Sequence, residues 1–104
     1  MRLGTPSAGG IVGNSSGVRM IDPESRPIYP EAARLAGIEG TPIIWLHISA
    51  DGKVVEARIH KSCGYTILDE SALRWARTRR FVPARRGGTP IEVEVTKAVR
   101  FYLY

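Results

Sequence analysis

The sequence predicts an α+β fold: a two-layer sandwich in which a three-stranded antiparallel sheet packs against two helices, in the order α-β-β-α-β. Residues 41–49 and 54–61 alternate apolar and polar side chains around an Asp-Gly pair, which is typical of a β-hairpin. Residues 66–79 instead repeat apolar side chains at helical spacing. The alternation returns over residues 91–103, which predicts a closing strand.

The length of 104 residues allows one domain with a tail. Residues 1–24 are rich in glycine and serine and are expected to form a flexible linker or arm, with a short ordered arm around residues 17–21 as the alternative. The folded domain is then expected to span residues 25–104. The chain has neither the ~20 apolar residues that cross a bilayer nor the apolar centre of a signal peptide. If the domain works outside the cytoplasm, its export signal or anchor is expected to lie outside this chain.

A short helix is predicted for residues 30–37. Pro30 suits a first turn, Glu31 complements the positive end of the helix dipole, and Gly37 can adopt the left-handed conformation that ends a helix. Tyr29, just ahead of the helix, is expected to be a packing residue. The side chains expected to face the core are Ala32, Leu35 and Ala36.

The hairpin is expected to turn at Asp51-Gly52, and each of its strands has one apolar face. Trp45 and His47 lie on the opposite face of the first strand, away from the helices. The core-facing side chains are expected to be Ile44, Leu46 and Ile48 in the first strand and Val55, Ala57 and Ile59 in the second.

The second helix is predicted for residues 66–79. Thr66 and Asp69 have the spacing of a capping box, with aspartate in the usual glutamate position. The predicted buried stripe is Leu68, Ala72, Trp75 and Ala76.

The last strand is expected to run from about Ile91 to the end of the chain. Lys97 interrupts its apolar face, which predicts a bulge or a bend. Its charged residues suit an edge protected against indiscriminate pairing, and such an edge can accept a strand from another protein. The alternatives are an ordinary edge, or one already paired in a homodimer.

Several short motifs then occur in an order that resembles the C-terminal domain of TonB-family energy transducers. They cover roughly residues 27–103. Three positions depart from the family pattern: Cys63 replaces a serine, Arg79 stands where many members carry tryptophan, and Lys97 lies in a normally apolar run. The matching motifs are Tyr29-Pro30, Ala33-Arg34, Gly37-Ile-Glu-Gly40, Asp51-Gly52, Ser62-Cys63-Gly64, Leu68-Asp69, Arg80-Phe81-Val82-Pro83-Ala84 and Gly88-Thr89-Pro90.

The resemblance implies a non-enzymatic periplasmic domain of a protein anchored in the inner membrane, with the anchor absent from this chain. In the family, an inner-membrane helix couples to a proton-driven motor of the ExbB/ExbD type, and a proline-rich segment spans the periplasm. The C-terminal domain then binds the N-terminal box of TonB-dependent outer-membrane transporters by strand addition. The transmitted force supports energy-dependent uptake of substrates such as siderophores, haem or vitamins.

The resemblance also implies two transporter-binding segments, one before the first helix and one in the last strand. Many family members carry glutamine where this chain has Arg26. The implied partner-binding residues are Arg26, Pro27, Ile28 and Tyr29, together with Glu92, Val93, Glu94, Val95, Thr96, Lys97, Ala98, Val99, Arg100 and Phe101.

Two other functions remain open: a TonB-like envelope adaptor in secretion or envelope assembly, and a small basic nucleic-acid-binding protein. The net charge of +5 suits an acidic protein surface, anionic lipid head groups or nucleic acid, and does not by itself select one of them. Nucleic-acid binding is not expected, because the aromatic side chains near the arginine cluster are expected to be buried. His60 precedes Cys63 by three residues across a strand end, which does not favour the geometry of a catalytic base, so no catalytic residue is expected. No metal or cofactor is expected either, with a weak metal contact of His47 and His60 on the outer face of the hairpin as the alternative. The arginine cluster is Arg74, Arg77, Arg79, Arg80, Arg85 and Arg86.

Overall fold

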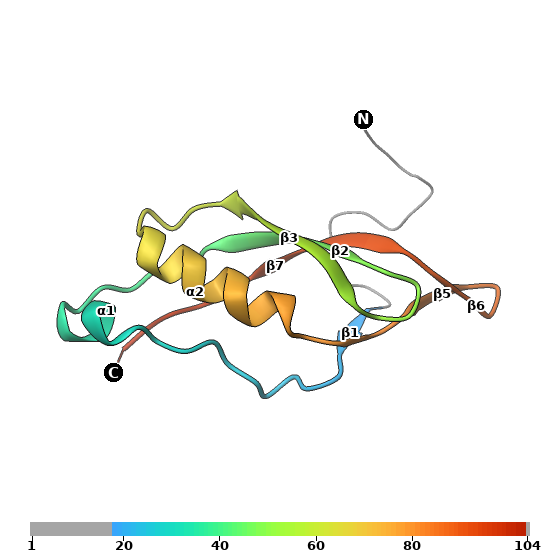
Figure 1. The fold of residues 1–104 in the computed structure, drawn as a ribbon, viewed down its shortest axis with the longest axis horizontal. Helices are drawn as coiled ribbons and strands as arrows, with labels where there is room; N and C mark the ends of the chain where they lie inside the picture. The colour runs from blue at the N-terminus through green and yellow to red at the C-terminus, as the bar shows by residue number, and fades with distance from the viewer. Residues whose placement is uncertain (1–17, 104) are drawn as a thin grey trace.

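The computed structural model describes residues 18–103, which form two layers (Figure 1). One layer is a three-stranded antiparallel sheet in the order β3-β2-β7, and helix α2 (Thr66–Arg77) lies across one of its faces. The predicted α+β class, with two helices and this sheet, is confirmed. Two further pairs of short strands, β1 with β4 and β5 with β6, accompany the sheet. Within residues 18–103, every helix is too short or too polar to cross a bilayer.

Strands β2 (Ile43–Ile48) and β3 (Val54–Lys61) form the predicted hairpin. Gly52 lies in the turn with φ of 90°, which favours glycine. The register shifts between His47 and Ile48, because His47 pairs with Glu56 while Ile48 pairs with Val54. Val55 is therefore the extra residue of a bulge and is 56% exposed, so its predicted place in the core is wrong.

Helix α2 begins at Thr66, as predicted, but the expected capping box does not form. The residue before the helix is Tyr65, which provides no side-chain cap, so Thr66 lies inside the helix and not at its cap. The carboxylate of Asp69 instead accepts hydrogen bonds from the Ser62 hydroxyl (2.5 Å) and the Cys63 N–H (3.2 Å). Asp69 thereby ties the segment after β3 to α2.

The apolar stripe of α2 packs on the sheet. Leu68, Ala72 and Ala76 are almost fully buried, as their spacing predicts, and Trp75 is half-buried at the side of the helix. The helix ends at Arg77, two residues before the predicted end. These side chains meet Ile44 on β2 and its neighbours in one core.

Helix α1 (Glu31–Leu35) is shorter than predicted and buries a different face. Ala33 is 1% exposed, whereas Leu35 is 73% exposed, so the predicted core face of Ala32, Leu35 and Ala36 is wrong. A helix of barely more than one turn has no continuous stripe that could orient it. Contacts at its ends do so instead.

Tyr29 provides the contact at the start of α1. Its ring packs edge-on against Phe101, with 5.5 Å between ring centroids, and its hydroxyl donates to the Ile38 carbonyl at 2.5 Å. The Ile38 N–H in turn donates to the Ala33 carbonyl at 2.9 Å. Burial, with a smaller contribution from Glu39, raises the pKa of Tyr29 above its usual value.

The last strand is shorter than the predicted run from about Ile91 to the end of the chain. Strands β5 (Ala84–Arg86) and β6 (Thr89–Ile91) form a hairpin, and β7 (Val93–Ala98) follows as the strand that joins β2. Of the bulge or bend predicted at Lys97, the bulge does not form, since β7 pairs with β2 in one unbroken register. Lys97 needs no bulge because its side chain is only half-buried.

The segment before α1 contains ordered structure. Strand β1 (Arg19–Met20) pairs with β4 (Phe81–Val82), and Val18 is buried beside it. From β1 the chain runs along one side of the molecule to α1 (Figure 1). We call residues 18–29 the arm. The flexible linker was predicted for residues 1–24; strand β1 lies within this range, where an ordered arm around residues 17–21 was the alternative, and residues 1–17 lie outside the described part.

Candidate functional site

Strand β7 lies at one edge of the three-stranded sheet, and within residues 18–103 it pairs with β2 alone. The pairing continues past the end of the strand. Phe101 and Gly40 exchange two backbone hydrogen bonds of 2.8 and 3.0 Å, and the Val99 N–H donates to the Pro42 carbonyl at 3.0 Å. These bonds establish which residues of the C-terminal segment direct their backbone groups toward β2.

Backbone groups in an antiparallel strand point alternately to one side and the other. Because Val99 and Phe101 bond toward β2, and the register is unbroken, Val95 directs its N–H and C=O toward β2 as well. The N–H and C=O groups of Glu94 and Ala98 therefore point away from β2. They face the side of β7 on which a further strand would pair.

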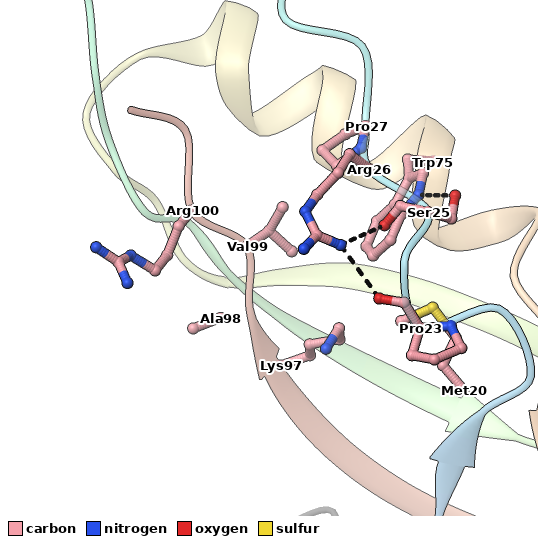
Figure 2. A pocket seen from close by; sticks show the side chains of 10 residues that line it. All are labelled: Met20, Pro23, Ser25, Arg26, Pro27, Trp75, Lys97, Ala98, Val99 and Arg100. Carbon is pink, nitrogen blue, oxygen red and sulfur yellow. Dashed lines mark hydrogen bonds between the residues drawn. The ribbon is translucent and has the colours of Figure 1, made fainter. Parts of the chain in front are cut away.

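A groove lies beside this edge, between β7 and the arm (Figure 2). It consists of two hollows of about 280 and 270 Å³ that share Met20, Lys97 and Ala98. Trp75 of α2 contributes to the first hollow, and Phe81 of β4 contributes to the second. We call the two hollows together the edge groove.

The arm that borders the edge groove is held against α2 by side-chain hydrogen bonds. The indole N–H of Trp75 donates to the Ser25 hydroxyl at 2.9 Å, and the Ser71 hydroxyl donates to the Ile28 carbonyl. Near β1, the Arg79 guanidinium lies 3.8 Å from the Asp22 carboxylate. These contacts hold the arm beside α2.

Charges differ between the two sides of β7. The side chains of Arg26 and Lys97 lie over the edge groove, and the Arg26 guanidinium donates to the carbonyls of Pro23 and Ser25, each at 3.1 Å (Figure 2). On the opposite face of the sheet, Glu94 accepts a hydrogen bond from the Trp45 indole at 3.3 Å. The groove side is therefore cationic, and the opposite face carries the strand's carboxylates.

Comparison with known proteins identifies the domain. A sequence profile of the Gram-negative bacterial TonB protein C-terminal family matches residues 25–103. The chain belongs to this family. The domain is 35% identical to the protein tonB2 of Pseudomonas aeruginosa, over 74% of this chain and 28% of that protein. It is 31% identical to the protein TonB of Vibrio cholerae, over 81% of this chain and 34% of that protein.

A solved structure agrees with this assignment. The solution NMR structure of the Pseudomonas aeruginosa TonB C-terminal domain matches with a TM-score of 0.70 and 26% sequence identity. The match covers 92% of this chain and 96% of that one. The chain spans only about a third or less of the length of the two TonB relatives, at 34% and 28%.

Within this TonB C-terminal domain, the edge groove brings together parts of both predicted binding segments. Arg26 and Pro27 come from the first segment, and residues 95–100 come from the second. Ile28 is 81% exposed outside the groove. The groove therefore joins residues that lie about 70 positions apart in the sequence.

Other predicted site residues have structural contacts instead. Val93 and Phe101 are core residues, and Tyr29 packs on Phe101, whereas Val95 is buried in the core and also lines the second hollow. The Glu92 carboxylate lies 2.6 Å from the His47 ring nitrogen, on the face opposite the groove.

Sequence reasoning missed the arm side of the edge groove. Met20, Pro23 and Ser25 fall in or beside the segment that was predicted as a linker, where glycine and serine dominate the composition. The spacing of Val18 and Met20, two residues apart, was the one available sign of a strand. Trp75 was predicted as a core residue, and it also lines the groove.

Cys63 lies at a packed turn. Burial is the main cause that raises the pKa of its thiol, which is opposite to the change that produces a nucleophilic thiolate. Its sulfur lies 3.7 Å from the Tyr65 carbonyl. Residues 18–103 contain no group of three or more side chains placed to hold a metal ion.

Proposed function

We propose that this domain is the transporter-binding end of a TonB-like energy transducer. It binds the N-terminal box of a TonB-dependent outer-membrane transporter as an added strand on β7. The observation that carries the proposal is the direction of the Glu94 and Ala98 backbone groups, which point away from β2, with Ala98 at the edge groove. Main-chain pairing of this kind gives affinity with tolerance of side-chain sequence.

The arrangement suits the transmission of force. β7 is paired along its whole length with β2, the central strand of the sheet, and β2 is paired with β3 in turn. A peptide paired alongside β7 transfers tension to several backbone hydrogen bonds together. The fixed arm on the other side of the groove limits the peptide to one path.

The rest of the proposed function belongs to the part of a full-length protein outside this chain. We infer that an upstream segment anchors the protein in the inner membrane and contacts a motor of the ExbB/ExbD type. The domain then works in the periplasm, without catalysis of its own. The transported substrates are of the siderophore, haem or vitamin type. Family membership and the similarity to TonB proteins support this assignment.

Titration with a synthetic transporter-box peptide tests the proposal, with backbone amide shifts as the readout. We expect shift changes concentrated in β7 and in the arm around Arg26, and new protection of the Ala98 amide from hydrogen exchange. The β5–β6 hairpin serves as an internal control, because it lies away from the groove. Changes concentrated on that hairpin, or none in β7, would contradict strand addition.

A second measurement separates transporter binding from self-association. Sedimentation of the free domain reports whether two copies pair through β7. If the peptide converts a dimer into a peptide-bound monomer, the same edge serves both. Salt-sensitive binding of DNA without a response to the peptide would favour the nucleic-acid function instead.

A further inference from the structure

The two faces of β7 differ in what a neighbouring strand would meet. Val95, Lys97 and Val99 lie on the helix side, where Val95 and Val99 are buried in the core and Lys97 reaches the edge groove. Glu94 lies on the opposite face, where its carboxylate accepts the Trp45 hydrogen bond. Glu94 and Lys97, the two charged residues of β7, therefore lie on opposite faces of this edge.

The helix side of this edge carries unopposed positive charge. Arg26 and Lys97 both line the first hollow, and in the described part of the chain neither forms an ion pair. The described residues that line the two hollows include no aspartate or glutamate. The Arg100 side chain points away from the groove (Figure 2) and lies over the Tyr102 ring at 5.1 Å. Arg26, Lys97 and Arg100 all line the first hollow, and of these three cations Arg26 and Lys97 direct their side chains over it (Figure 2).

A strand that pairs with β7 also alternates its side chains between these two faces. Side chains on the helix side become cross-strand neighbours of Lys97 and approach Arg26, whereas those on the other side become neighbours of Glu94. Opposite charges at such positions attract and like charges repel, and each effect changes affinity severalfold.

We propose that the edge groove selects a peptide with a carboxylate on its helix-facing side, and that Arg26 and Lys97 are the residues that determine this specificity. The inference rests on the proposed strand addition at β7. The favoured partner is an extended segment that carries its acidic residue at a groove-facing position. Such positions recur at every second residue. An acidic residue at the intervening positions weakens binding, because it meets Glu94.

The test is a scan with peptides of about eight residues, in which one glutamate is moved through an otherwise constant Val/Thr sequence. Every peptide has the same net charge, so general attraction to the positively charged domain is constant across the series. We expect the dissociation constants measured for the full chain to alternate with a period of two residues, by about fivefold between neighbouring positions. A matching glutamine scan should show no such alternation.

Three variants assign the effect to its source. Lys97→Gln and Arg26→Gln should each reduce the alternation by at least about twofold, and raising the salt concentration should reduce it further. Arg77→Gln is the matched control, because it removes the same charge from an exposed position on α2 outside the groove. Circular dichroism confirms that the variants are folded.

The outcomes distinguish this inference from the proposed function. If all peptides bind at β7 with equal affinity, charge selection is refuted and strand addition stands. An alternation that persists unchanged in both Lys97→Gln and Arg26→Gln also refutes the assignment to these residues. If no peptide binds and no β7 amide shifts, the proposed function fails and the inference fails with it.

Discussion

Substitution of Gly52 by alanine should destabilise this domain far more than the same change at Gly64. The two glycines have nearly the same backbone conformation, with φ of 90° and 95°. They differ in their surroundings. A Cβ atom at Gly52 would lie 2.1 Å from the Phe81 carbonyl oxygen, whereas a Cβ atom at Gly64 would meet no atom within 4 Å.

The expected difference can be estimated from this geometry. Alanine in a left-handed conformation costs about 1–2 kcal/mol, and this cost is common to both positions. At Gly52 the hairpin turn or β4 must also move, which costs about 1–3 kcal/mol for overpacking. The Phe81 N–H donates to the Gly52 carbonyl at 2.9 Å, and disturbing this bond adds about 1 kcal/mol. Gly52→Ala should therefore cost about 2–4 kcal/mol more than Gly64→Ala.

Urea unfolding followed by far-UV circular dichroism measures this difference. Thermal unfolding should show a midpoint roughly 10–20 °C lower for Gly52→Ala than for Gly64→Ala. Because Phe81 lies in β4, which pairs with β1 of the arm, Gly52→Ala should also weaken peptide binding at the edge groove. Unfolding free energies that agree within about 0.5 kcal/mol would show that the contact with the Phe81 carbonyl is unimportant.

Three other substitutions test the edge, the turn before α2 and the pH dependence. Ala98→Pro removes a backbone donor that faces the groove, so peptide affinity should fall at least about tenfold with little loss of stability; Val99→Pro, which breaks a bond to β2, should instead lower the unfolding free energy by about 3 kcal/mol or more. If Ala98→Pro and Val99→Pro lowered the stability equally, the assigned alternation of backbone directions along this segment would be contradicted. Asp69→Ala should cost about 2–4 kcal/mol because it leaves two donors unpaired, whereas exposed Glu70→Ala should stay within about 0.5 kcal/mol. The raised pKa of Tyr29 favours its neutral form in the folded state, so stability should fall as the pH rises above about 10. Tyr29→Phe should flatten that decline. If the urea midpoint of the variant fell with pH as steeply as that of the unchanged protein, the role of Tyr29 would be refuted.

Local sequence patterns predicted most of the sheet and the long helix. The alternation of Ile44, Leu46 and Ile48 identifies the buried face of β2 without knowledge of its neighbours, because a strand places every second side chain on one face. The same is true of Leu68 and Ala72 in α2, where helical spacing predicts the buried stripe. Such patterns fail for α1, which is too short for a periodic signal and is oriented by its ends.

Local sequence patterns could not predict the edge groove. Periodicity identifies the two faces of β7, but which backbone groups point outward depends on the partner strand and on the register that Val99 and Phe101 adopt with it. Likewise, nothing in the Gly/Ser-rich start of the chain indicates that Met20 would lie beside Lys97.

The sequence by itself therefore determined the class of fold and the core faces of β2 and α2, because these follow from short-range periodicity, and its motifs resemble those of one family. Only the tertiary structure decided where Asp69 finds its hydrogen-bond donors and how the arm meets β7. It also placed Arg26 and Lys97 on one side of that strand and Glu94 on the other. Such long-range contacts depend on which packed surfaces fit together, and that is a property of the whole folded chain.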